Sequence, residues 1–125
     1  MEFKEAINQF CTAISSKNLS KLKEFIPVSG DLTAILSDGA VIDSSQEYLE
    51  FHKEWFAEKD WTITFDPVFT EESSEMGYAI IETEYFDKEE DGSPFAIEIL
   101  KTVIMRKQEN GWSIVHSQQT EGEED

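Results

Sequence analysis

The sequence has a single cysteine, few basic residues and no long hydrophobic run. Cys11 cannot form a disulfide within the chain, which excludes a disulfide framework. No stretch approaches the roughly 20 apolar residues of a membrane span, and the first ten residues, MEFKEAINQF, lack the apolar core of a secretory signal. With 125 residues, we expect one soluble, cytoplasmic domain that needs no metal or disulfide for stability.

Positive charge is also scarce, because 10 basic residues face 27 acidic ones and the formal net charge is -17. A field of that sign repels phosphate groups, so neither nucleic acid nor an anionic membrane is an expected partner. Much of the negative charge lies in short runs at 71–75, 87–91 and 121–125, a pattern typical of solvated turns and chain ends. We expect residues 1–120 to form the domain and residues 121–125 to be an acidic disordered tail.

The first half of the chain shows helical spacing of its apolar residues. A helix is predicted from Phe3 to Ile14, and a shorter one over 19–26 that Pro27 ends. Residues 28–43 carry Gly-Asp and Asp-Gly turn signals around a short apolar run, which indicates a brief strand or a loop. Ser44 and Glu47 fit a capping box, so a third helix is predicted from Ser44 to Phe56.

After Asp60 the apolar period changes from 3.6 to 2, as expected for strands with one buried face. Strand-like runs follow at 61–70, 78–86, 95–105 and 112–120, separated by turn clusters. Helices followed by a series of antiparallel strands predict an α+β architecture in layers.

The turn QENG at 108–111 leaves the register of the last two strands open. A three-residue loop pairs Gln108 with Trp112 and Ile104 with His116, whereas a two-residue loop places Met105 opposite His116. We favour the three-residue loop, because Gly111 suits a last turn residue with positive φ. Strict alternation along the last strand would also put Trp112 and His116 on one face of the sheet.

Four features of the chain form a recognisable combination: two N-terminal helices, a capped third helix that ends in WF, Thr102 in LKTVIMRK, and a final strand NGWSIVHSQQT. This combination resembles the nuclear transport factor two-like superfamily. Within it, the chain resembles the SnoaL-like and ketosteroid-isomerase-like branch. The resemblance implies a cystatin-like cone, in which a curved sheet wraps a pocket that the helices close, and it implies a homodimer. Isomerases and cyclases of this kind use a pocket aspartate, whereas here Asp66 is the only strand aspartate and lies on the more polar face. These relatives also usually carry an arginine two residues before the equivalent of Thr102, and here Leu100 occupies that position.

The residues predicted to line a pocket combine apolar walls with a few polar groups, as small-molecule sites require. They are His52, Trp55, Tyr85, Thr102, Ile104, His116, Gln118 and Thr120. The predicted catalytic residues are His116 as a general base and Tyr85, which would steady an oxyanion, a role that Gln118 could also fill. Each histidine has an alternative interpretation as a packed core residue.

The other chemical side chains favour plainer interpretations. Cys11 is expected in the core, and Glu82 and Glu84 are expected to face solvent or an interface because unpaired carboxylates are costly inside. The two histidines have no metal-binding spacing, so neither a metal nor a cofactor is expected. The leading hypothesis is a protein that binds a small apolar or carbonyl-containing molecule and acts on it by proton transfer, as an isomerase, cyclase or dehydratase. The alternative is a non-catalytic dimerisation module that uses its exposed sheet face.

Overall fold

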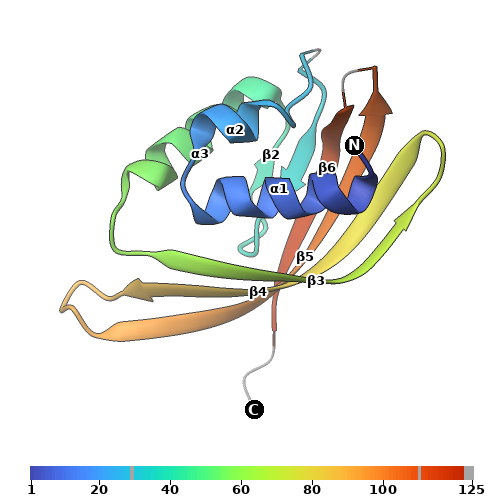
Figure 1. The fold of residues 1–125 in the computed structure, drawn as a ribbon. Coiled ribbons are helices and arrows are strands. Elements are labelled where there is room, and N and C mark those ends of the chain that lie inside the picture. The colour runs from blue at the N-terminus through green and yellow to red at the C-terminus, as the bar shows by residue number, and fades with distance from the viewer. Residues whose placement is uncertain (29, 110, 123–125) are drawn as a thin grey trace.

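The computed structural model describes residues 1–28, 30–109 and 111–122, and it places three helices on one face of a curved sheet (Figure 1). The helices are α1 (Phe3–Ser15), α2 (Leu19–Lys23) and α3 (Ser45–Ala57). The strands are β1 (Thr33–Ile35), β2 (Val41–Ile42), β3 (Thr62–Glu72), β4 (Met76–Lys88), β5 (Pro94–Gln108) and β6 (Gly111–Glu121). The α+β class predicted from the element order is confirmed.

Helices α1 and α3 form where the spacing predicted them. One face of α1 is buried, and it includes Phe3, Ile7, Phe10 and Ile14. The Ser44 hydroxyl accepts a hydrogen bond from the backbone N–H of Glu47 at 3.1 Å, so Ser44 is the N-cap of α3. The predicted cap therefore fixes where α3 begins, and this start decides which side chains α3 turns toward the sheet.

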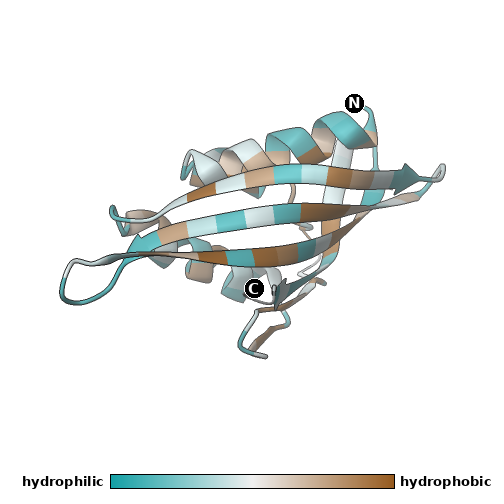
Figure 2. Cartoon of the chain, turned by 90° about the horizontal axis from the view of Figure 1, so that it is seen from below, coloured by the Kyte–Doolittle hydropathy of each residue, from teal (hydrophilic) through white to brown (hydrophobic). Residues whose placement is uncertain are grey.

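The sheet has the strand order β2-β1-β6-β5-β4-β3. All neighbours are antiparallel except β1 and β6, which are parallel. The stretch predicted as a brief strand or a loop is thus a β1–β2 hairpin that extends the sheet beyond the last strand of the chain. Helices cover the inner face of the sheet, and Figure 2 looks onto the opposite, outer face. Apolar side chains between the helices and the inner face form the core, among them Phe10, Trp61, Ile81, Val103 and Ile114.

The β5–β6 hairpin corrects the predicted turn. Gln108 pairs with Gly111 rather than with Trp112, so the favoured three-residue loop is wrong; residue 110 itself lies outside the described residues. A β-bulge at Val115 then shifts the register by one, because Met105 pairs with Ile114 while Ile104 pairs with His116. The predicted pairing of Ile104 with His116 is therefore present, but an extra residue in the strand produces it.

The bulge also reverses the face of the second half of β6. Trp112 and Ile114 are buried on the inner face before the bulge, and Ser117 is buried on the same face after it. His116 consequently points to the outer face, opposite to Trp112. The expectation that both share one face is wrong, because strict alternation holds only in a strand without a bulge.

The C-terminal boundary lies slightly beyond the predicted domain end. β6 continues through Glu121, and the backbone N–H of Gly122 donates to the Glu98 carbonyl oxygen at 2.8 Å. Of the predicted tail, Glu121 therefore belongs to β6 and Gly122 is hydrogen-bonded to β5, and residues 123–125 lie outside the described residues. Within the part of the chain that the structure describes, no helix has the length and apolar character to span a bilayer.

Candidate ligand cavity

A cavity of about 330 Å³ lies between α3, the β1–β2 hairpin and the inner face of the sheet; we call it the inner cavity. Its volume is at the lower end of the range found for small-molecule sites, roughly 300–1,000 Å³. Most of its wall is aromatic or aliphatic. The lining residues are Ala34, Leu36, Ser37, Asp38, Tyr48, Phe51, His52, Trp55, Ile63, Phe65, Thr83, Tyr85, Ile97, Ile99, Lys101, Ser117 and Gln119.

Helix α3 supplies the aromatic side of the inner cavity. Tyr48, His52 and Trp55 lie on one face of the helix at spacings of three and four residues, so their rings meet. Trp55 stacks on Trp61 with ring centroids 4.0 Å apart and an interplanar angle of 10°. The Trp61 indole N–H in turn donates to the Trp55 carbonyl oxygen at 2.8 Å. The wall is thus held in place by both stacking and a hydrogen bond.

His52 is the histidine of the inner cavity. Its Nδ1 lies 2.8 Å from the Tyr48 carbonyl oxygen, and because a carbonyl only accepts, Nδ1 carries the proton. Burial lowers the pKa of His52 to about 4, against a smaller opposing effect of this hydrogen bond, so the ring is neutral at pH 7. In that state Nε2 is an acceptor. Of the two histidines, His52 lines the inner cavity and His116 does not.

Lys101 is the cationic residue of the inner cavity and was not among the residues predicted for it. Its side chain is only 5% exposed, and its Nζ lies 5.4 Å from the ring centroid of Phe10 and 5.8 Å from that of Phe65. Within the described parts of the chain, no ion pair or hydrogen bond is made by this amine. Burial lowers the pKa of Lys101 to about 8, because the charged form loses its hydration.

Two neutral groups complete the polar part of the inner cavity. The Tyr48 hydroxyl is buried and has no hydrogen-bond partner among the described residues. Burial raises the pKa of Tyr48 well above its ordinary value and that of Cys11 to about 11, so neither can serve as an anionic partner for Lys101 at neutral pH. A buried hydroxyl without a partner is uncommon in folded proteins, and a bound molecule or a water molecule would satisfy it. As expected, Cys11 is buried.

Tyr85 points inward as expected and lines the inner cavity. Its hydroxyl donates a short hydrogen bond to the Asp87 carboxylate. Burial is the larger cause and this hydrogen bond the next one, and they raise the pKa of Tyr85 to about 12. Because a hydroxyl has one proton to donate, this bond competes with the predicted use of Tyr85 as a donor to an oxyanion.

The structure brings three of the eight predicted pocket residues into the inner cavity and leaves five outside it. His52, Trp55 and Tyr85 line the cavity. The other five lie on the outer face, because each follows or precedes an inward residue in its strand; they are Thr102, Ile104, His116, Gln118 and Thr120. On β5 the sequence was ambiguous, since apolar residues occupy both faces of LKTVIM. The signal that could have identified Lys101 was a lone lysine in phase with Ile97, Ile99 and Val103.

His116 makes a hydrogen-bonded contact at the edge of the outer face. Its Nδ1 lies 2.6 Å from the Thr33 hydroxyl, across the parallel pairing of β1 with β6. We therefore expect His116→Ala to change the affinity of the inner cavity for a ligand by less than about twofold. Loss of one partly exposed hydrogen bond should lower the free energy of unfolding by about 1 kcal/mol. Ligand titration and thermal melting of the variant would check both values, and a large loss of affinity would contradict this placement.

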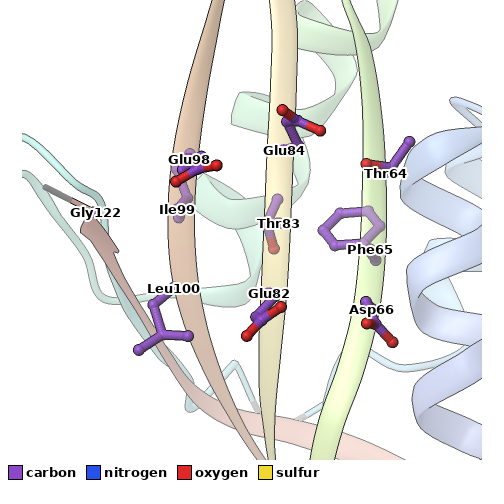
Figure 3. Close-up of a pocket in the computed structure, with 10 residues that line it drawn as sticks. All are labelled: Thr64, Phe65, Asp66, Glu82, Thr83, Glu84, Glu98, Ile99, Leu100 and Gly122. Carbon is purple, nitrogen blue, oxygen red and sulfur yellow. The ribbon is translucent and has the colours of Figure 1, made fainter. Parts of the chain in front are cut away.

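A second concave region lies on the outer face, where β3, β4 and β5 carry acidic side chains (Figure 3). Glu84 is directly opposite Glu98, and Asp66 is directly opposite Glu82. Like charges at such positions repel. Across the described ranges, no group of three or more His, Cys, Asp or Glu residues is arranged to hold a metal ion. The glutamates face solvent as expected, and the inner cavity remains the better candidate for a small-molecule site.

Solved structures with this arrangement share little sequence with the chain. An NTF2-like superfamily protein from Salmonella enterica serovar Typhimurium is 18% identical, with a TM-score of 0.79, over 96% of this chain and 88% of that one. A ketosteroid isomerase-like protein from Erwinia carotovora atroseptica is 12% identical, with a TM-score of 0.78, over 97% and 94%. The CaMKII hub of S. rosetta is 17% identical, with a TM-score of 0.73, over 94% and 92%.

At these identities the likeness concerns the fold, which hosts unrelated functions. A comparison with curated proteins finds no match. The model of the SnoaL-like domain, in contrast, matches residues 4–120, which is nearly the whole described chain. The resemblance stated from the helices and the final strand is confirmed, and the protein belongs to the SnoaL-like domain family.

Proposed function

We propose that the inner cavity binds a small organic molecule with an apolar body and one carbonyl or carboxylate oxygen. The observation that carries this proposal is the buried Lys101 amine, which meets the cavity without a partner in the described chain. A buried charge needs compensation, and a ligand oxygen would supply it. The oxygen would accept hydrogen bonds from Lys101 and from the free Tyr48 hydroxyl, while the body packs on Trp55 and the aliphatic wall.

Benzoate is a suitable test ligand, because it combines one ring with one carboxylate. Its binding should quench the fluorescence of Trp55 in the cavity wall. Lys101→Met should weaken binding at least about tenfold, since a hydrogen bond to a charged group contributes roughly 1.5–3 kcal/mol. Lys53→Met removes an exposed lysine of α3 and is the matched control. Equal affinity of the two variants for benzoate would contradict the proposal.

The reaction class expected from the sequence is proton transfer at a carbon beside a carbonyl, and we retain it as the proposed chemistry of this cavity. Such a reaction requires a base within reach of the substrate. His52 Nε2 is the acceptor that the geometry favours, because Nδ1 is already committed to the Tyr48 carbonyl oxygen. With a pKa of about 4, His52 is a weak base, so the carbonyl would have to be strongly polarised by Lys101.

A second candidate function is self-association as a homodimer through the outer face of the sheet. Apolar side chains of β3, β4 and β5 form an outer apolar patch there, which comprises Phe69, Met76, Tyr78 and Ile104. Phe69 is 49% exposed, and its ring centroid lies 5.7 Å from that of Tyr78. Exposed aromatic clusters of this kind are typical of protein interfaces. The likeness to the S. rosetta CaMKII hub supports an association role.

Phe69→Glu should shift a homodimer to monomer, because it places a charge within the outer apolar patch. Analytical ultracentrifugation over a range of concentrations would measure the shift, with Val28→Glu, at an exposed position outside the sheet, as the control. Association should also tighten when salt is added, since two chains with a formal charge of -17 each repel one another. A wild-type protein that stays monomeric at all concentrations would eliminate this function.

A further inference from the structure

The inner cavity encloses a primary amine, that of Lys101, among mostly apolar side chains. The chain has 27 acidic residues, yet no carboxylate pairs with Lys101 in the described structure. Asp38, on the turn between β1 and β2, is the one carboxylate among the lining residues of the inner cavity. On the neighbouring strands, the residues directly opposite Lys101 are Ile81 and Gln119. The fold therefore buries an amine that forms no ion pair among the described residues.

All other titratable groups near the amine are neutral at pH 7. Cys11 of α1 has a pKa of about 11, His52 of α3 has a pKa of about 4, and the pKa of Tyr48 is well above its ordinary value. Tyr85 of β4 has a pKa of about 12. With a pKa of about 8, roughly one-tenth of Lys101 is unprotonated at pH 7, against less than about one-thousandth of an ordinary lysine. An unprotonated amine is a nucleophile.

We propose that Lys101 is a nucleophilic lysine whose Nζ condenses with the carbonyl carbon of an aldehyde or ketone held in the inner cavity. This inference rests on the proposed function and names its substrate class. The nitrogen lone pair forms the new C–N bond, and the carbonyl oxygen takes up the two protons that the nitrogen loses. The C–O bond then breaks, water leaves and an imine remains, so atoms and electrons balance without a further reactant. We assign the donation of a hydrogen bond to the departing oxygen to Tyr48, which lines the same cavity and whose hydroxyl has no partner among the described residues.

The surroundings of Lys101 and the chemistry of an imine together bear on the proton transfer proposed for the inner cavity. The ring centroids of Phe10 and Phe65 lie within 6 Å of Nζ and attract its charged form, but burial outweighs this attraction and lowers the pKa of Lys101 to about 8. When the imine nitrogen is protonated, the resulting iminium ion attracts electrons from the carbon beside the C=N carbon, which makes a C–H bond on that carbon more acidic. His52 could then accept a proton from it despite its low pKa. The imine thus supplies the polarisation that proton transfer requires.

Reductive trapping would test the inference on the full chain. Benzaldehyde is added with cyanoborohydride at pH 7, which converts an imine into a stable benzyl-amine, and the modified lysine is located by peptide mass spectrometry. We expect Lys101 to be labelled at least about tenfold faster than any other lysine, because its neutral fraction is larger. The rate should rise with pH and level off above pH 8, whereas labelling of surface lysines should continue to rise toward pH 10.

Two controls separate this inference from the proposed function. Lys101→Arg keeps the cation and should abolish labelling at this position, while Lys53→Arg should leave labelling of Lys101 unchanged. Benzoate cannot form an imine under these conditions, so it reports binding alone. Benzoate binding without faster labelling of Lys101 would overturn the nucleophilic role and leave the proposed function intact. Absence of both binding and labelling would overturn the two together.

Discussion

Lys101→Met is expected to raise the free energy of unfolding at pH 7 by about 2–3 kcal/mol, although it removes the group that we assign to ligand binding. Folding lowers the pKa of this lysine from 10.5 to about 8, which corresponds to about 3 kcal/mol of destabilisation when the amine is charged in the unfolded chain. Methionine has a similar length, carries no charge and fits an apolar environment. A residue that weakens the fold and serves the cavity is typical of a functional site.

The pH dependence of this effect has a definite sign. Between pH 8 and 10.5 the unfolded chain holds a proton on Lys101 that the folded chain has lost, so the wild-type protein becomes more stable as the pH rises through this interval. Cys11 acts in the opposite direction, because its folded pKa of about 11 exceeds the ordinary value of 9.0. Subtracting the curve of the Met variant from that of the wild type gives the effect of Lys101 together with its smaller electrostatic coupling to Cys11.

Chemical denaturation of both proteins from pH 6 to pH 10.5 would measure the difference. The advantage of Lys101→Met should be largest below pH 8 and should disappear near pH 10.5. Lys53→Met should show no pH-dependent difference, since Lys53 is exposed. If Lys101→Met were less stable than the wild type at pH 7, the amine would have a stabilising partner, and the reasoning for an uncompensated charge would fail.

Trp61→Ala is expected to lower the free energy of unfolding by about 3–5 kcal/mol, the range found for large aromatic residues in cores. Trp61 is completely buried and stacks on Trp55. Its indole N–H donates to the Trp55 carbonyl oxygen, and Lys17 Nζ lies 4.1 Å from its ring centroid. The substitution removes the stacking, the hydrogen bond and the cation–π contact together, and it leaves a void behind the wall of the inner cavity.

The same variant should lose affinity for a cavity ligand, because Trp55 would no longer be held against Trp61. Trp61→Phe keeps a ring for stacking but lacks the N–H donor, so it should lose about half as much stability and retain most of its binding. Thermal melting and benzoate titration of the three proteins would separate these contributions. A Trp61→Ala variant with unchanged affinity would show that the wall of the cavity does not depend on this stack.

The elements themselves could be predicted because each depends on short-range physical rules. The spacing of Phe3, Ile7, Phe10 and Ile14 requires a helix to put them on one face, and Ser44 marks the start of another helix through its capping hydrogen bond. Alternation after Asp60 likewise predicted the long strands. The rule that alternate strand residues share a face failed at two places, between Pro67 and Phe69 in β3 and at Val115 in β6, where a β-bulge or irregularity shifts the register.

Residue spacing and motifs were sufficient to predict an α+β protein of the SnoaL-like family, a buried Cys11 and the placement of His52 and Trp55 of α3 at the cavity. Which face of each strand the helices cover could not be read from the residue pattern and depends on long-range packing. That choice turned His116 outward and Lys101 inward, and it placed the lysine beside neutral groups contributed by helices distant in sequence. The physical reason is that a side chain's burial, and with it the pKa of an amine, depends on long-range packing rather than on its neighbours along the chain.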